Sequence, residues 1–159
     1  MAELTARDMS RLALVHPSLV AVIVEAARTC PINFMVVEGV RSKETMWLNW
    51  GKGRTVAQCV AAGVPSVYAK PGLPKVTWLA NPLNSNHRLR EDGFGRAADL
   101  LPAPYDWKDP TPFAIVAAHM LKASNTLKVP IRWGKDWDRD GIAGEKGETD
   151  SPHFELWGV

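Results

Sequence analysis

Two histidines and two aspartates of this 159-residue chain are spaced so that together they could form a metal site. His87 and Asp99 lie in one segment, "SNHRLREDGFGRAADLLP" (85–102), and His153 follows Asp150 by three residues near the C-terminus. Zinc binds imidazole nitrogen and carboxylate oxygen, and a catalytic zinc takes three protein ligands and leaves the fourth position to water. His87, Asp99 and His153 would make such a set, with Asp150 as the general base for the bound water.

The same residues lie in two motifs that resemble those of a known enzyme family. "S-N-H … G-R-A-A-D-L", followed by "D-S-P-H-F-E-L", resembles the motifs S-x-H…G-x-A-x-D and [DE]-x-x-H of the LAS-type zinc peptidases. This group includes D-alanyl-D-alanine carboxypeptidases, D-Ala-D-Ala dipeptidases and the L-alanyl-D-glutamate peptidases of phage endolysins. The N-terminal half, with "HPSLVAVIVEAA", "FMVVEGVRS" and "GKGRT", is most similar to the last of these. The resemblance runs from about Arg11 to Leu156.

The resemblance implies a role for each matching residue. His87, Asp99 and His153 match the zinc ligands, and Asp150 matches the acidic residue that activates water. The family usually has two residues between the histidine and the next motif glycine, whereas seven, "RLREDGF", stand here. This insertion brings a rival carboxylate, Asp92. We favour Asp99 as the ligand because it alone lies in the G-R-A-A-D-L context.

Two further residues match the family outside the zinc ligands. Arg41 matches an arginine that binds a substrate carboxylate or stabilises the oxyanion, and the guanidinium fork suits the free carboxylate of D-glutamate. Ser85 matches a serine that positions the site. Met46 stands where the family often has glutamine, which puts a polar substrate contact there in doubt. Glu155 shares the His153 face of a terminal strand and is either a partner of the site or solvated.

The leading functional hypothesis is a phage-type endolysin, a zinc metallopeptidase that degrades bacterial peptidoglycan between L-alanine and D-glutamate. One alternative is a D,D-carboxypeptidase or dipeptidase on the same scaffold. Another is a catalytically silent zinc-binding domain, as in hedgehog signalling domains. The presence of Asp150 beside His153 argues against the silent alternative.

An acidic segment suggests a second metal site. "D-W-D-R-D-G" (136–141) resembles the first half of a calcium-binding EF-hand loop, with Asp136, Asp138 and Asp140 at the first three ligand positions. The usual glutamate at the last position is replaced by Gly147. The segment is therefore either an acidic turn or a calcium site that could regulate activity.

The elements that must position these residues have the order of an α+β fold. Helices come first and strands dominate the second half, so we expect one domain (1–159) with helices packed on a small antiparallel sheet. The resemblance implies a hedgehog- or D-Ala-D-Ala-peptidase-like scaffold, and no separate cell-wall-binding domain is expected. Helices are predicted after Thr5 and over 17–30, 43–51, 55–63 and 112–127, and strands over 34–40, 75–80, 95–101, 129–134 and 152–158.

Composition limits the kinds of molecule that the protein is expected to bind. A net charge of +2 is too weak to indicate nucleic acid, and no nucleic-acid-binding motif is present. Cys30 and Cys59 are expected to be buried thiols rather than a disulfide. Trp78, Trp107 and Trp137 lie in or near predicted loops and could line a groove for sugar rings or peptide stems.

The sequence also bears on where the protein acts. It shows no secretory signal and no apolar run long enough to span a membrane. We therefore expect a monomer that is made in the host cytoplasm and reaches the wall through a membrane pore-former.

Overall fold

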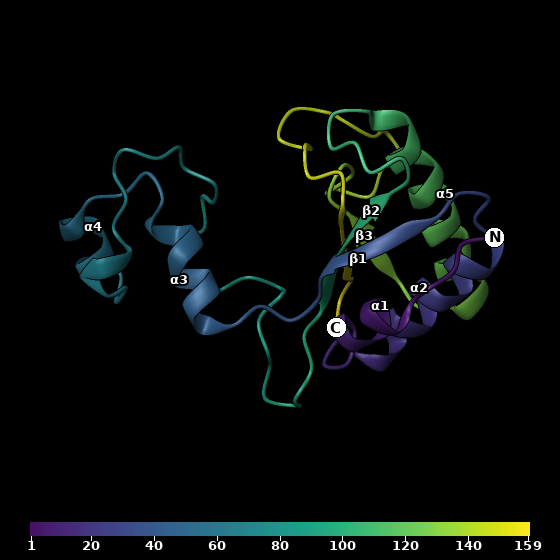
Figure 1. Cartoon of the computed structure of the whole chain (residues 1–159), viewed down its shortest axis with the longest axis horizontal. Coiled ribbons are helices and arrows are strands. Elements are labelled where there is room, and N and C mark those ends of the chain that lie inside the picture. The colour runs from purple at the N-terminus through teal and green to yellow at the C-terminus, as the bar shows by residue number, and fades with distance from the viewer.

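A four-stranded antiparallel sheet forms the centre of the molecule in the computed structural model, which describes residues 1–159 (Figure 1). The strands, in the spatial order β1-β2-β4-β3, are β1 (Phe34–Glu38), β2 (Ala97–Pro102), β3 (Ile131–Trp133) and β4 (His153–Leu156). The register pairs Asp99 of β2 with Glu38 of β1 on one side and with His153 of β4 on the other. The two middle strands therefore bring together motifs that are far apart in the sequence.

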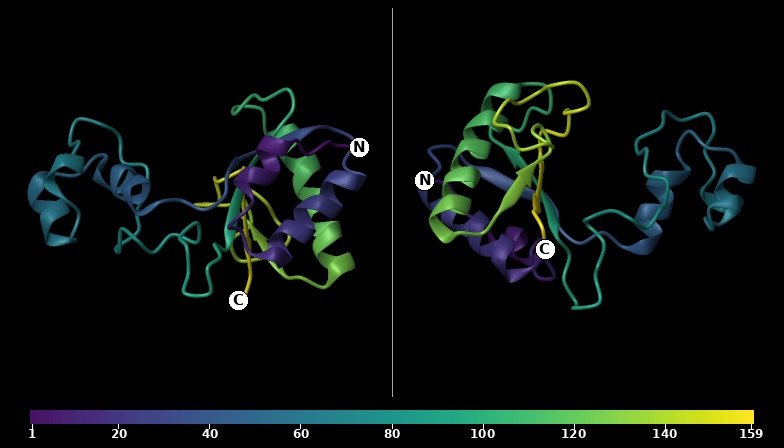
Figure 2. Two further views of the ribbon diagram at one scale, coloured as in Figure 1. Left: turned by 60° about the horizontal axis from the view of Figure 1, so that its bottom comes forward. Right: turned by 180° about the vertical axis from the view of Figure 1, so that it is seen from behind.

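Three helices pack beside the sheet and enclose the main core (Figure 2). They are α1 (Ala6–Arg11), α2 (Pro17–Thr29) and α5 (Pro110–Leu127). A capping box begins α1, since the Thr5 hydroxyl accepts from the Asp8 N–H and the Asp8 carboxylate accepts from the Thr5 N–H. The core cluster holds 23 buried residues from α2, α5, all four strands and the segments beside them. The expected α+β class, with helices packed on an antiparallel sheet, is confirmed.

Strand alternation separates the core from the site. Phe154 and Leu156 of β4 belong to the helical core, so His153 and Glu155 project from the opposite face of the sheet. Asp99 projects from that same face of β2, because its neighbours on either side in the strand reach the core. The face of the sheet away from the helices is thus the one that carries polar chemistry.

Residues 42–80, which we call the lobe, stand apart from the rest of the chain, which we call the body (Figures 1 and 2). The lobe contains α3 (Lys43–Gly51), α4 (Val56–Ala61) and a short 3-10 helix (Ser66–Tyr68). It has a small core of its own, made by Trp50, Cys59 and Val64. Cys59 is buried here and Cys30 in the main core, and both are free thiols, as expected.

Two expectations about the elements were wrong. No strand forms over 75–80, because side chains of the lobe, Trp50 and Arg54, bind the carbonyl groups of this segment in place of a neighbouring strand. The last helix begins at Pro110 rather than at residue 112, since the Asp109 carboxylate caps it by accepting from the Thr111 N–H. None of the helices combines the length and hydropathy needed to cross a membrane.

Candidate metal centre and active-site cleft

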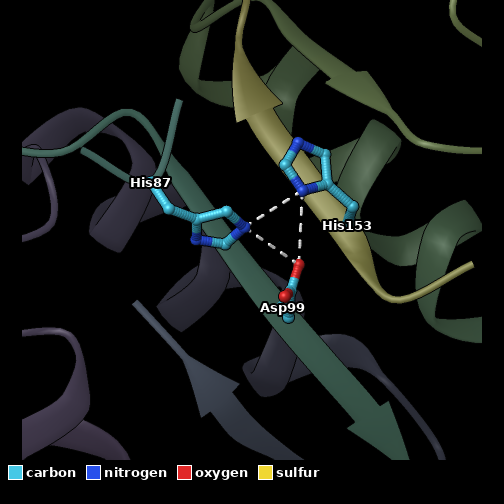
Figure 3. A group of neighbouring side chains, drawn as sticks. All are labelled: His87, Asp99 and His153. Atoms are coloured by element: carbon cyan, nitrogen blue, oxygen red, sulfur yellow. Dashed lines mark hydrogen bonds and ion pairs between the residues drawn. The ribbon is translucent and has the colours of Figure 1, made fainter. Parts of the chain in front are cut away.

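Three side chains predicted as metal ligands converge on one point (Figure 3). His87 Nε2 and His153 Nδ1 each lie 3.3 Å from Asp99 Oδ1, and the two nitrogens are 3.2 Å apart. His87 comes from the loop before β2, Asp99 from β2 and His153 from β4. Asp99 Oδ1 is buried and makes no hydrogen bond, which fits an oxygen that is meant for a cation. The arrangement therefore fits a three-ligand metal centre.

The other nitrogen of each imidazole has an acceptor that fixes its proton. His87 Nδ1 lies 2.8 Å from the Gly39 carbonyl oxygen, and His153 Nε2 lies 2.7 Å from Glu155 Oε1. Because each of these acceptors takes the ring N–H, the lone pairs of His87 Nε2 and His153 Nδ1 are left for a metal. The two histidines thus present different ring nitrogens, Nε2 of His87 and Nδ1 of His153, to the candidate metal position.

Glu155 is buried and is the centre of a polar network rather than a solvated side chain. Its Oε2 accepts from Asn86 Nδ2 at 2.7 Å and from Arg132 Nη2 at 3.0 Å, while Oε1 faces His153. Arg132 is the residue opposite Glu155 across β3 and β4. No sequence pattern indicates this role for Asn86 or Arg132, because their partners are set by the tertiary structure and the strand register.

Asp99 and His153 each shift the pKa of the other. Burial alone would lower the pKa of His153, but its contacts with the carboxylates of Asp99 and Glu155 outweigh burial and raise that pKa to about 9. Burial likewise would raise the pKa of Asp99, yet the neighbouring His153 and His87 hold it well below its ordinary value. A proton on His153 Nδ1 therefore competes with a metal for that nitrogen.

Asp150 lies beside the centre, with Oδ2 3.9 Å from His153 Nδ1 and its side chain half exposed. Burial raises the pKa of Asp150, and the negative charge of Asp99 adds to the effect. Its backbone N–H donates to the Gly134 carbonyl at 3.0 Å, and the Gly134 N–H donates to the His153 carbonyl at 2.8 Å. A Cβ at Gly134 would collide with the Asp150 backbone and lie 2.8 Å from its Cβ. This close approach fixes Asp150 next to the metal ligands.

Arg41 reaches the same centre from the end of β1. Its Nε and Nη2 donate to the two carboxylate oxygens of Glu38, both at 2.8 Å, and Nη2 lies 4.0 Å from Asp99 Oδ2. The Arg41 N–H donates to the His87 carbonyl at 2.8 Å, so the two site residues share a backbone contact. Nη1 makes no hydrogen bond within the chain. Arg41 is therefore held rigidly with one pair of N–H donors free.

The serine and the insertion around His87 are both ordered. Ser85 Oγ accepts from the His87 N–H at 3.1 Å, which fits a positioning role. In the insertion 88–94, the Asp92 carboxylate binds Arg96 and so lies outside the metal centre. Arg90 Nη2 donates to Asn86 Oδ1 at 2.9 Å, so the insertion supports the network behind His153.

A cleft of about 910 Å³ contains the three candidate metal ligands and is lined by both the body and the lobe. On the body side its wall includes Trp137, whose ring centre lies 5.4 Å from that of His153. On the lobe side the wall includes Trp78. Trp107 packs instead against Phe113 and does not line the cleft. Met46 is buried, so it offers the cleft no polar contact.

The acidic segment forms a tight loop. Asp136 accepts from the N–H groups of Asp140 and Gly141, and carboxylate oxygens of Asp136, Asp138 and Glu148 lie within 4.8 Å of one another. Glu148 is buried and accepts from the Trp137 N–H at 2.6 Å. A carboxylate therefore stands one residue after the glycine that breaks the sequence pattern.

Comparisons with known proteins show which family this chain resembles. A model of the phage L-alanyl-D-glutamate peptidase family matches residues 70–157. The L-alanyl-D-glutamate peptidase of Escherichia phage T5 is 28% identical over 154 residues, which cover 92% of this chain and 91% of that protein. The crystal structure of the Serratia marcescens L-Ala D-Glu endopeptidase ChiX is similar with a TM-score of 0.59 and 26% identity, over 96% of this chain and 88% of that chain.

Proposed function

The chain belongs to the phage L-alanyl-D-glutamate peptidase family, whose model matches more than half of its length, and from this premise we propose how it acts. It is a peptidoglycan-degrading endopeptidase of the endolysin type, which hydrolyses the bond between L-alanine and D-glutamate in stem peptides. Both relatives, each of which is named for this bond, agree with the family and with the peptidase activity.

One observation carries the assignment of the cofactor. His87 Nε2, Asp99 Oδ1 and His153 Nδ1 converge within 3.3 Å, and the carboxylate oxygen has no other partner. Two imidazoles and a carboxylate are a donor set that suits zinc, so these residues would hold a zinc ion. When bound, zinc supplies Lewis acidity, which makes water a stronger acid and polarises a carbonyl group.

The residues around the ligands perform the proton transfers and bind the peptide. Asp150, with its raised pKa, accepts the proton that the attacking water loses and delivers it to the amine of D-glutamate as the peptide bond breaks. Arg41 Nη1 donates to the oxygen of the scissile carbonyl as negative charge develops there. The Glu38 carboxylate holds the guanidinium in place for this contact. Ser85 positions His87 at the edge of the substrate cleft.

We further propose the domain organisation, the oligomeric state and the place of action of the protein. Residues 1–159 act as one zinc peptidase domain, because the cleft is shared by the body and the lobe, and the domain works as a monomer. Its substrate is the bacterial wall, which it reaches from the host cytoplasm after a pore-former opens the membrane.

Mass spectrometry of digested peptidoglycan tests the activity. The proposal expects fragments with a new N-terminal D-glutamate, produced by the protein and lost when a chelator removes zinc. Release of free D-alanine instead would identify the D,D-carboxypeptidase or dipeptidase alternative. Binding of zinc without any cleavage would identify the silent zinc-binding alternative.

We also propose that the acidic loop binds calcium through Asp136 and Asp138, with Glu148 in place of the missing glutamate. The support is the short separation of these carboxylates. Asp140, the third aspartate of the motif, is not one of these three carboxylates. Because Glu148 binds the backbone N–H of Trp137, whose ring centre lies 5.4 Å from that of His153, bound calcium would stabilise this side of the cleft. Calcium should raise the thermal unfolding temperature of chelator-treated, zinc-reloaded protein, and no change in either stability or rate would contradict the site.

A further inference from the structure

Trp78 is a large apolar side chain that the fold presents to solvent. It is 77% exposed, more than any other tryptophan of the chain, and it lies on the lobe wall of the cleft that contains His87 and Asp99. An exposed tryptophan alone carries little meaning, because single apolar side chains are common on protein surfaces. The backbone on either side of Trp78 distinguishes it.

Side chains of the lobe form hydrogen bonds with the backbone on both sides of Trp78. Trp50 Nε1 donates to the Leu79 carbonyl at 2.8 Å, and Arg54 Nη2 donates to the Thr77 carbonyl at 2.9 Å. Arg54 is only 6% exposed and its guanidinium stacks 3.9 Å from the centre of the Trp50 ring. Burying an arginine is costly unless its donors are used, and here two of them bind carbonyl groups. The lobe thus holds the backbone on either side of Trp78 in place, while the indole ring itself is mostly exposed.

The neighbours of Trp78 on this wall are polar donors and small apolar groups. Asn49 and Lys52 of the lobe line the same cleft, as do Val76 and Thr77. A flat aromatic face next to amide, ammonium and hydroxyl groups is suited to a ring that has an apolar face and a polar rim. Sugar rings with acetamido and hydroxyl substituents have this character.

We propose that Trp78 binds a sugar ring of the peptidoglycan glycan strand while the attached stem peptide lies at the metal centre. The inference rests on the proposed function, because the L-alanine of a stem peptide is joined to a sugar through a lactyl group. A sugar therefore lies close to the bond that is cleaved and must occupy the cleft or its margin. The continuity of the Trp78 wall with the metal site supplies a surface for it.

Kinetics on a matched pair of soluble substrates test the proposal. One is a disaccharide-linked stem peptide, and the other is the same peptide with an acetyl group in place of the sugar. For the zinc-loaded protein, we compare the ratio of kcat/KM for these substrates. Trp78→Ala should lower this ratio about tenfold, which corresponds to about 1.4 kcal/mol, and Trp78→Phe should restore most of it. Trp107→Ala is the matched control, since Trp107 is exposed but lies outside the cleft.

Each outcome is decisive. An unchanged ratio in Trp78→Ala, including the case where both substrates lose activity equally, would overturn the sugar contact. A fall in the ratio that Phe does not repair would also contradict it, since any aromatic face should stack. If the wild-type protein releases no N-terminal D-glutamate from either substrate, the proposed function itself fails. Circular dichroism of each variant shows that the lobe remains folded.

Discussion

Replacing Glu155 with glutamine should weaken zinc binding although Glu155 does not itself touch the metal position. Its two oxygens accept three N–H groups, from His153, Asn86 and Arg132. A glutamine offers one oxygen and one NH₂ group at the same place. If the oxygen faces Asn86 and Arg132, the NH₂ group faces His153 Nε2 and favours the tautomer with the proton on Nδ1, the nitrogen that should bind zinc.

The opposite orientation of the amide is also unfavourable. With the oxygen toward His153, the NH₂ group would meet the N–H donors of Asn86 and Arg132, which lie 2.7 and 3.0 Å from the oxygen in the wild-type protein. With zinc bound, either orientation leaves a buried donor without an acceptor, at a cost of about 1–3 kcal/mol, whereas the first orientation leaves none in the metal-free form. Loss of a hydrogen-bonding partner behind a metal-binding histidine typically lowers affinity about 10–100-fold, or about 1.4–2.8 kcal/mol. The two estimates agree, so we expect a loss in this range.

Competition with a chromogenic chelator measures the zinc dissociation constant of Glu155→Gln at pH 7.5. The matched control is Glu91→Gln, which removes the same charge from an exposed position in the insertion. Thermal unfolding of both variants without metal separates loss of zinc affinity from loss of folding. A dissociation constant within twofold of the wild-type value would refute the argument that Glu155 sets the tautomer of His153.

Three other changes test the rest of the centre. Asp150→Asn should abolish hydrolysis while zinc content by elemental analysis stays near one ion per chain, because Asp150 moves a proton and is not a ligand. Gly134→Ala should lower activity at least tenfold, since a Cβ there collides with the Asp150 backbone, and a variant with wild-type rates would contradict the need for this contact. Zinc affinity should fall as pH decreases below about 9, by up to about tenfold per pH unit. The reason is that His153 has a pKa of about 9 without metal and must lose its proton to bind zinc. Chelator competition between about pH 6 and 9 measures this dependence, and an affinity that does not change with pH would contradict it.

The candidate ligand set was accessible to sequence reasoning because Asp99 and His153 lie on strands and all three residues lie in recognisable motifs. Alternation along a strand puts His153 and Glu155 on one face, and the motif around Asp99 marks it over Asp92. The structure agrees with both inferences, since Glu155 contacts His153 and Asp92 binds Arg96. Where a site follows from strand period and a paired motif, residue types are sufficient to find it.

The groups that orient the ligands were not accessible in the same way. His87 is oriented by the backbone carbonyl of Gly39, which has no side chain to mark it. Arg132 reaches Glu155 only because β3 pairs with β4 in one particular register. The lobe was missed for a related reason: its helices were predicted, but their separation from the body depends on which apolar residues form the second core around Trp50. Such relations are properties of packing, and no local pattern encodes them.

The insertion 88–94 shows how an apparent irregularity can belong to the site. Arg90, within it, donates to Asn86 Oδ1, and Asn86 Nδ2 donates in turn to Glu155, which holds His153. Arg90 also binds the carbonyl oxygen of Val159, so the insertion ties the C-terminal end of the chain to the loop before β2. The extra residues of this segment, five more than the family usually has, would loosen a metal centre if they were free to move. Because their arginine instead closes a continuous set of hydrogen bonds behind His153, the longer link restricts the ligands rather than freeing them.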